Sequence, residues 1–269
     1  MNISVKDLGD VKVSYRLIPS ETSYTLVFIH GFPFNQSIWD PQMQALQRYA
    51  DLLSYDVRGH GNTVSSHRFF SIDLFARDLL QLIDSLQLKQ VVLCGISMGG
   101  YIALRAMEID AGKITGLILC DTNAVADSNE AKLNRFAGID TLLKNGNVPY
   151  ADNFVGKVLA QSTLQHKPHV VRHVKQTITE NSPEDICATL LALASRTDTS
   201  AGLSKIAVPV LVIRGEHDAL MSNEQTRQLT AGISNAKLEI IPGSGHLPNL
   251  ENPVEFNKAV SDFMAGLSG

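Results

Sequence analysis

The chain has 269 residues, with 23 Lys and Arg against 27 Asp and Glu, which gives a formal net charge of −4. Hydrophobic residues make up 44% of the chain and charged residues 19%, so a disordered or collagen-like chain is excluded. The small acidic excess also argues against a nucleic-acid-binding protein, because such proteins carry clustered Lys and Arg.

The first predicted element is a β-hairpin. Residues 3–8 and 11–17 alternate polar and apolar side chains around Gly9-Asp10, a pair that is typical of a tight turn. Shorter, continuously apolar runs follow at residues 25–29, 52–55, 91–94, 117–120 and 210–213, with a weaker run at 238–241. Runs of this kind are typical of parallel strands that are buried on both faces.

Helical patterns lie between these strands, with apolar residues recurring every three or four positions. They predict helices at residues 41–49, 72–86, 98–108, 223–230 and 253–264. The alternation of strands and helices predicts the α/β class with a doubly wound, mostly parallel sheet. Between residues 123 and 205 no strand pattern appears. We therefore expect an α/β core built from residues 1–122 and 206–269, with residues 123–205 inserted as a helical lid.

The most informative motif is Gly-Ile-Ser-Met-Gly-Gly at residues 95–100. It directly follows the predicted strand 91–94 and directly precedes a predicted helix. In this context G-x-S-x-G describes a nucleophile elbow, a tight turn that projects a serine from the edge of the sheet. The glycines are needed because side chains there would collide across the turn. Ser97 is therefore the predicted nucleophile.

A serine hydroxyl needs a base to accept its proton and an acid to orient that base. His246 follows the last predicted strand in a Gly-rich turn and is the best candidate base. Asp218 follows the strand 210–213 and is the expected acid, with Asp121 after the strand 117–120 as the alternative. The order Ser97, Asp218, His246 is the order found in α/β-hydrolases.

Two backbone N–H groups are needed to stabilise the oxyanion that forms during acyl transfer. Met98 follows the nucleophile and supplies one. Phe32, in the His-Gly-Phe-Pro segment after the strand 25–29, is the natural second donor. We expect Phe34, Trp39 and Leu220 to contribute to an apolar substrate pocket.

These motifs resemble the α/β-hydrolase superfamily over nearly the whole chain. Residues 56–63 are similar to its D-x-R-G-x-G-x-S segment, with Thr63 in place of the serine. The elbow, the Leu-Cys-Asp-Thr segment at 119–122 and the Trp-Asp-Pro-Gln segment at 39–42 are most similar to enol-lactone hydrolases, small carboxylesterases and acyl-homoserine lactonases. The resemblance implies the same triad (Ser97, Asp218, His246) and the same oxyanion donors (Phe32, Met98).

The sequence does not indicate a cofactor or a metal site. Cys94, Cys120 and Cys187 lack the spacing of a zinc site, and Pro168 interrupts the register of His166, His169 and His173. No apolar run approaches the about 20 residues of a membrane helix. Residues 1–15 also lack the pattern of a signal peptide. We therefore expect a cytoplasmic protein with no membrane or nucleic-acid partner.

Together these features predict a cofactor-free serine hydrolase whose partner is a small-molecule ester or lactone. The apolar lid favours acyl-homoserine lactones. Two alternatives stay open. One is another reaction on the same triad, either hydrolysis of a carbon–carbon bond or perhydrolysis. The other is a ligand receptor that keeps the triad but turns over little. Monomer and homodimer are equally compatible with the sequence.

Overall fold

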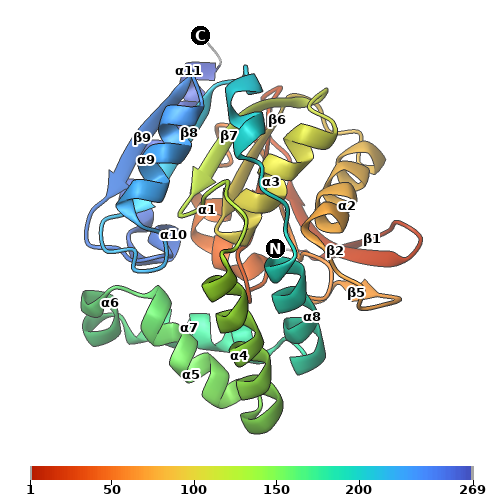
Figure 1. Ribbon diagram of the computed structural model, residues 1–269. Coiled ribbons are helices and arrows are strands. Elements are labelled where there is room, and N and C mark those ends of the chain that lie inside the picture. Colours follow the sequence, from red (N-terminus) through yellow and green to blue (C-terminus); the bar gives the residue numbers. More distant parts are fainter. Residues whose placement is uncertain (1, 268–269) are drawn as a thin grey trace.

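The computed structural model describes residues 2–267, which fold into a central sheet flanked by helices, with a helical layer at one end of the sheet (Figure 1). The strand order is β1-β2-β4-β3-β6-β7-β8-β9, and the short strand β5 also pairs with β2. The strands span Ser4–Asp7 (β1), Val11–Ile18 (β2), Thr25–Ile29 (β3), Asp51–Tyr55 (β4), Val64–Ser65 (β5), Val91–Ile96 (β6), Ile114–Cys120 (β7), Val210–Gly215 (β8) and Ala236–Ile241 (β9).

The pairing confirms the α/β prediction. The predicted hairpin forms, because β1 pairs antiparallel with β2 and Ser4 lies opposite Tyr15. From β4 onward every pair along the sheet is parallel. All residues of β3 and β6 are buried, as their continuous apolar sequence requires. Strand β9 lies at the sheet edge and is mostly exposed, which explains why its apolar pattern is weaker.

The helices of the core are α1 (Asp40–Ala45), α2 (Ile72–Ser85), α3 (Met98–Ile109), α9 (Asn223–Gly232), α10 (Pro248–Glu251) and α11 (Pro253–Leu267). Helix α3 packs on β6 and α2 packs on α3, while α1 packs against α11. Helix α2 buries its apolar stripe, and Ser71 caps its N-terminus by accepting a hydrogen bond from the N–H of Leu74 at 3.0 Å. There are also two 3₁₀ turns in the described residues, Gln36–Trp39 (η1) and Ser200–Lys205 (η2), and η2 packs against α9.

Five α-helices lie between β7 and β8 in the described chain and form the layer at the lower end of the molecule in Figure 1. They are α4 (Asn129–Asn145), α5 (Asn147–Val158), α6 (Gln161–His166), α7 (Pro168–Thr179) and α8 (Pro183–Ala194). Helix α5 includes Pro149 in its first turn. The first turn tolerates proline because its N–H groups have no partner within the helix.

None of the helices in the described part of the chain is long and apolar enough to cross a membrane.

Candidate active site

Ser97 lies in a strained turn between β6 and α3. Its backbone angles are φ +53° and ψ −115°, a conformation that costs a non-glycine residue about 1–3 kcal/mol. The neighbouring glycines make the turn possible. A Cβ on Gly95 would lie 2.3 Å from the carbonyl oxygen of Gly99, and a Cβ on Gly99 would lie 2.2 Å from that of Ile29. Thr122 fixes the turn from β7 by donating a hydrogen bond to the carbonyl of Ser97 at 2.9 Å.

His246 and Asp218 meet at the same edge of the sheet. Nδ1 of His246 lies 3.0 Å from both carboxylate oxygens of Asp218, and both residues are buried. The two loops that carry them are in close contact, because a Cβ on Gly215 would lie 1.8 Å from the carbonyl oxygen of Gly245. His246 is tied to the helical layer, since its N–H donates to the carbonyl of Val158 at 2.8 Å.

The environment of Asp218 favours its charged form. Burial alone would raise the pKa of Asp218, but the charge and hydrogen bond of His246 lower it to about 2. The backbone N–H groups of Leu220 and Met221 donate to Oδ1 of Asp218 at 2.8 and 3.3 Å. A carboxylate that faces Nδ1 fixes the imidazole with Nδ1 protonated and leaves Nε2 as the basic nitrogen.

The alternative acid, Asp121, lies beside this pair and is also buried. One carboxyl oxygen, Oδ1, accepts a hydrogen bond from the N–H of Gly215 at 2.9 Å. Burial and the nearby charge of Asp218 raise the pKa of Asp121 well above its usual range. Potential ligand atoms of Asp121, Asp218 and His246 all lie within 4.8 Å of one another. The contact between His246 and Asp218 has the length of a direct hydrogen bond.

The loop after β3 lies against Ser97. A Cβ on Gly31 would lie 3.2 Å from Cβ of Ser97. Within residues 2–267, the N–H groups of Phe32 and Met98 donate to no protein acceptor. His30 fixes the loop: its Nδ1 lies 2.8 Å from the carbonyl oxygen of Gly31, and its Nε2 accepts from the N–H of Val57 at 2.9 Å. Burial lowers the pKa of His30 to about 4, so this imidazole is neutral.

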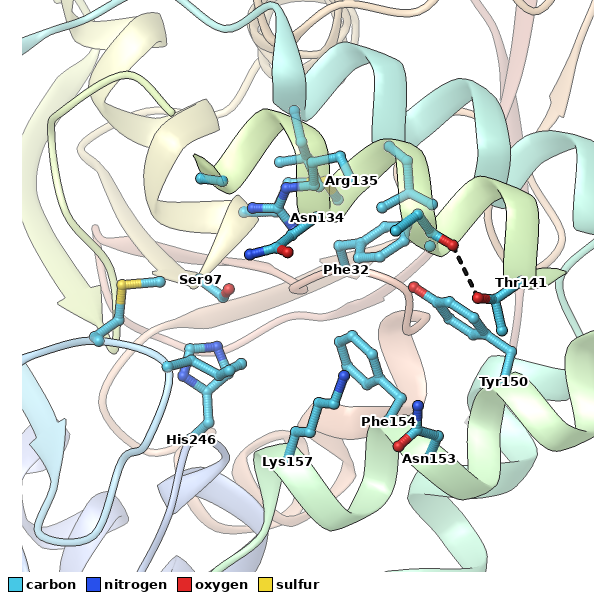
Figure 2. Close-up of a pocket in the computed structure, with 18 of the residues that line it drawn as sticks. Phe32, Ser97, Asn134, Arg135, Thr141, Tyr150, Asn153, Phe154, Lys157 and His246 are labelled. Carbon is cyan, nitrogen blue, oxygen red and sulfur yellow. Dashed lines mark hydrogen bonds between the residues drawn. The ribbon is translucent and has the colours of Figure 1, made fainter. Parts of the chain in front are cut away.

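A cavity of about 570 Å³ separates this edge of the sheet from the helical layer. Ser97 and His246 lie at one end of it, and Phe32 lines it between Ser97 and Tyr150 (Figure 2). Met98 and Leu220 also line it. Helices α4 and α5 supply most of the opposite wall, including Arg135, Tyr150, Phe154 and Lys157. A small molecule in this cavity would therefore contact both the elbow and the helical layer.

Two residues expected in the pocket do not line this cavity. Trp39 is fully buried, with its ring 4.9 Å from that of Phe28 and 6.1 Å from that of Phe256, so it belongs to the core. Phe34 is also fully buried and reaches the cavity only indirectly, through its contact with Phe154. The expectation that Phe34 and Trp39 contribute directly to the substrate pocket is corrected. Both aromatic side chains pack beneath the site and support it.

The histidines at 166, 169 and 173 lie apart from the elbow. His166 and His169 are exposed, and Nε2 of His173 lies 3.2 Å from the carbonyl oxygen of Ser37. Proline at residue 168 starts α7, so His166 and His169 lie on different helices.

Glu251, which was not predicted from the sequence, holds the His246 loop. This fully buried carboxylate accepts hydrogen bonds from the N–H groups of Gly245 and Ala160, both at 2.8 Å, and from that of Leu247 at 3.3 Å. It thereby joins the His246 loop to the start of α6. The only sequence signal was a single charged residue in the otherwise uncharged stretch 247–252 before the last helix.

The geometry agrees with comparisons with known proteins. Residues 26–259 match the family described as "Alpha/beta hydrolase family". The 3-oxoadipate enol-lactonase 2 of Acinetobacter baylyi is 28% identical over 259 residues, covering 95% of this chain and 94% of the relative.

Solved structures give the same result. A thermophilic esterase from Thermogutta terrifontis superposes with a TM-score of 0.93 at 28% identity, covering 99% of both chains. The enol-lactonase from Burkholderia xenovorans superposes with a TM-score of 0.90 at 25% identity, covering 97% of this chain and all of that one. This chain therefore belongs to the alpha/beta hydrolase family.

Proposed function

We propose that this protein is a carboxylic ester hydrolase that cleaves an ester or lactone through an acyl-enzyme on Ser97. The observation that carries the proposal is that a strained serine elbow and a buried His246–Asp218 pair open onto one cavity. The enol-lactonase and esterase relatives support the same bond type.

In the proposed reaction, Nε2 of His246 accepts the hydroxyl proton while Oγ of Ser97 forms a bond to the carbonyl carbon. The carbonyl π electrons move onto oxygen, and the N–H groups of Phe32 and Met98 donate to this oxyanion. When the oxyanion collapses, the bond to the alcohol oxygen breaks and His246 returns the proton to that oxygen. Water then repeats the sequence on the acyl-enzyme, releasing the acid and free Ser97.

Asp218 orients the imidazole and stabilises the imidazolium formed in each half-reaction. Its pKa of about 2 keeps it ionised throughout the neutral range. Metal is not needed for these steps. We therefore predict that hydrolysis continues at an unchanged rate in the presence of a chelator.

Residues 123–205 are proposed to act as a lid over residues 1–122 and 206–269. Helices α4 and α5 supply the wall opposite Ser97, which supports a role in selecting the substrate. Leu220 belongs to the proposed substrate-binding residues, together with Phe32 and Phe154.

Acyl-homoserine lactones are the second candidate among the substrates. The observation that favours them is the aromatic side of the cavity, where the rings of Phe154 and Tyr150 stack at 5.8 Å and that of Phe32 lies 6.1 Å from Phe154. An apolar tail would bury its surface there.

The test of the proposal is steady-state turnover of a short p-nitrophenyl ester. A hydrolase releases many equivalents of p-nitrophenol per protein. A ligand receptor that keeps the triad would release at most about one, and this result would overturn the proposal. Assays of carbon–carbon bond hydrolysis and of perhydrolysis, run on the same preparation, compare the two other reactions that the triad could perform.

A further inference from the structure

The cavity combines two cationic side chains with an absence of carboxylates. Arg135 comes from α4 and Lys157 from α5, and Figure 2 shows them on opposite sides of the space next to Ser97 and His246. No Asp or Glu occurs among the described residues that line it. A concave site lined by charge of one sign concentrates ligands of the other sign.

The charge of Arg135 is not cancelled by its neighbours. Its Nε donates to the buried carboxylate of Asp127 at 3.1 Å, but Asp127 also pairs with the buried guanidinium of Arg196. Two guanidinium groups therefore share the carboxylate of Asp127, and the nearby charge of Asp198 acts on Arg196 and not on Arg135. Arg196 is further held by the carbonyl of Val125 and by the ring of Tyr101. Asp127 thus fixes Arg135 without neutralising it.

Several hydrogen-bond donors facing the cavity have no protein acceptor within residues 2–267. These are the two Nη groups of Arg135, Nζ of Lys157 and the side-chain amides of Asn134 and Asn153. Arginine and lysine side chains lose conformational entropy when they are ordered, and a cavity for purely apolar ligands gains nothing from them. Charge-assisted bonds to a carboxylate would use these donors directly.

We propose, building on the ester-hydrolase function, that the substrate carries a carboxylate in addition to the ester or lactone bond, and that Arg135 and Lys157 bind this carboxylate. The apolar surface of Phe32 and Phe154 then holds the part of the substrate between the carboxylate and the reacting carbonyl. Arg135 and Lys157 are specificity-determining residues and take no part in bond breaking.

The test compares esters that differ only in charge. Methyl half-esters of dicarboxylic acids with four to six carbons are paired with methyl esters of the monocarboxylic acids of equal chain length. A second arm places the carboxylate on the alcohol side of the ester. We expect kcat/KM to favour the anionic ester of at least one pair by about tenfold to a hundredfold, the effect of a charge-assisted hydrogen bond. This preference should weaken as ionic strength rises.

Matched variants separate binding from folding. Arg135→Gln and Lys157→Gln should each lower kcat/KM for the preferred anionic ester by about tenfold and should lower kcat/KM for the neutral ester by much less. Lys132→Gln, on the same helix as Arg135 but outside the cavity lining, is the control and should change neither substrate. If a variant loses hydrolysis of both esters, circular dichroism shows whether it is misfolded. If it is misfolded, the other of the two single variants provides the test.

Failure of this inference and failure of the proposed function look different. If wild type hydrolyses neutral esters with no preference for any anionic partner, the carboxylate site is wrong and the hydrolase stands. If it hydrolyses no ester at all, the proposed function is wrong.

A second inference comes from the other carboxyl at the sheet edge. Oδ2 of Asp121 is buried and has no hydrogen-bond partner among the described residues. An uncompensated buried carboxylate beside the charged Asp218 is costly, whereas a carboxylic acid can donate its proton to Asp218. The groups facing Asp121 are Asp218, His246 and the thiol of Cys120. We infer that Asp121 is a positioning residue that keeps its proton and donates a hydrogen bond from Oδ2 to Asp218.

Asparagine copies the protonated acid, because its amide can donate to Asp218 while its oxygen accepts from Gly215. We therefore expect Asp121→Asn to stay within about threefold of wild-type kcat, and Asp121→Ala to lose about tenfold. The acid limb of the pH–rate profile should move to higher pH in Asp121→Ala and stay in place in Asp121→Asn. A purely structural role would not shift this limb. A loss in Asp121→Asn as large as that in Asp218→Asn would overturn the inference.

Stability gives an independent readout. The native-state pKa of Asp121 is raised, so the native state binds a proton that the unfolded state releases above about pH 4. The stabilising effect of that proton is present below pH 4 and is lost as pH rises toward the raised pKa. The free energy of unfolding of Asp121→Asn, relative to that of wild type, should therefore increase as pH rises from 4 to 8. A difference that is independent of pH would contradict a protonated Asp121.

Discussion

The edge of the sheet and the helical layer above it differ in how their polar groups are satisfied. At the edge, the carboxylates of Asp218 and Glu251 are held by protein donors: Asp218 accepts from His246 and two backbone N–H groups, and Glu251 accepts from three. On α4 and α5, the donors that face the cavity lack protein acceptors among the described residues. From this difference we infer that the edge of the sheet positions the reacting groups, whereas α4 and α5 provide donors that a bound ligand would accept from.

This comparison makes a direct prediction: changes at the sheet edge should affect all substrates equally, whereas changes in the helical layer should alter the ratio between substrates. The largest effect is expected for Ser97→Ala. It should lower kcat by about 10⁴–10⁶ for every ester tested, because the remaining rate comes only from binding and the oxyanion donors. Substrate affinity, measured by equilibrium binding, should change little. Activity within tenfold of wild type would place the nucleophile elsewhere.

The next effect distinguishes the two carboxyls at the edge. Asp218→Asn should lower kcat by about 10⁴, because the amide favours the imidazole tautomer with its proton on the wrong nitrogen. Asp121→Asn serves as the matched control, since it removes a carboxyl from the same buried cluster. If Asp121→Asn proved the more damaging of the two, the acid of the triad would follow β7 instead of β8.

Glu251 tests whether the edge is held by its buried network. Glu251→Ala leaves three N–H groups without an acceptor, at about 1 kcal/mol or more each, so the free energy of unfolding should fall by about 3 kcal/mol. Urea denaturation measures this loss. Glu255→Ala, at an exposed position of α11, is the control and should stay within about 0.5 kcal/mol of wild type. Equal effects would mean that the network contributes little.

The smallest effect concerns the apolar side of the cavity. In a series of acyl-homoserine lactones, kcat/KM should rise by about fourfold per carbon, or about 0.8 kcal/mol per buried CH₂, until the cavity is full. The gain from one carbon should stay below that from one carboxylate. A series with constant kcat/KM would show that the tails do not enter the cavity. A series with kcat/KM above that of every anionic ester would show that apolar contacts, and not the donors on α4 and α5, select the substrate.

The sheet edge and the helical layer also differ in how much of each could be predicted from the sequence. The elbow, His246 and Asp218 were accessible because each follows a strand directly, and the carboxyl ends of neighbouring parallel strands meet at one edge. The hairpin and the buried parallel strands followed from alternating and continuous apolar patterns, whereas the order of the strands in the sheet was not predicted. These features depend on local backbone geometry, which a single sequence encodes well.

The other features depend on contacts between distant segments. Trp39 and Phe34 were expected in the pocket, but packing against Phe28, Phe256 and Phe154 decides which aromatic residues line it. Arg135 was one of several basic residues in the lid. Only the placement of Asp127 and Arg196, sixty-nine positions apart in the chain, shows that Arg135 is fixed by a carboxylate that it shares with a second guanidinium.

The central claim is that Ser97 forms a covalent acyl-enzyme, and labelling tests it most directly. We would incubate the protein with diethyl p-nitrophenyl phosphate, which transfers a diethylphosphoryl group to an activated serine, and analyse the intact chain and its peptides by mass spectrometry. The account predicts one diethylphosphoryl group per chain, located on Ser97, with parallel loss of ester hydrolysis and no labelling of Ser97→Ala. Inhibition with Ser97 unmodified, or hydrolysis that continues after Ser97 is fully labelled, would contradict it.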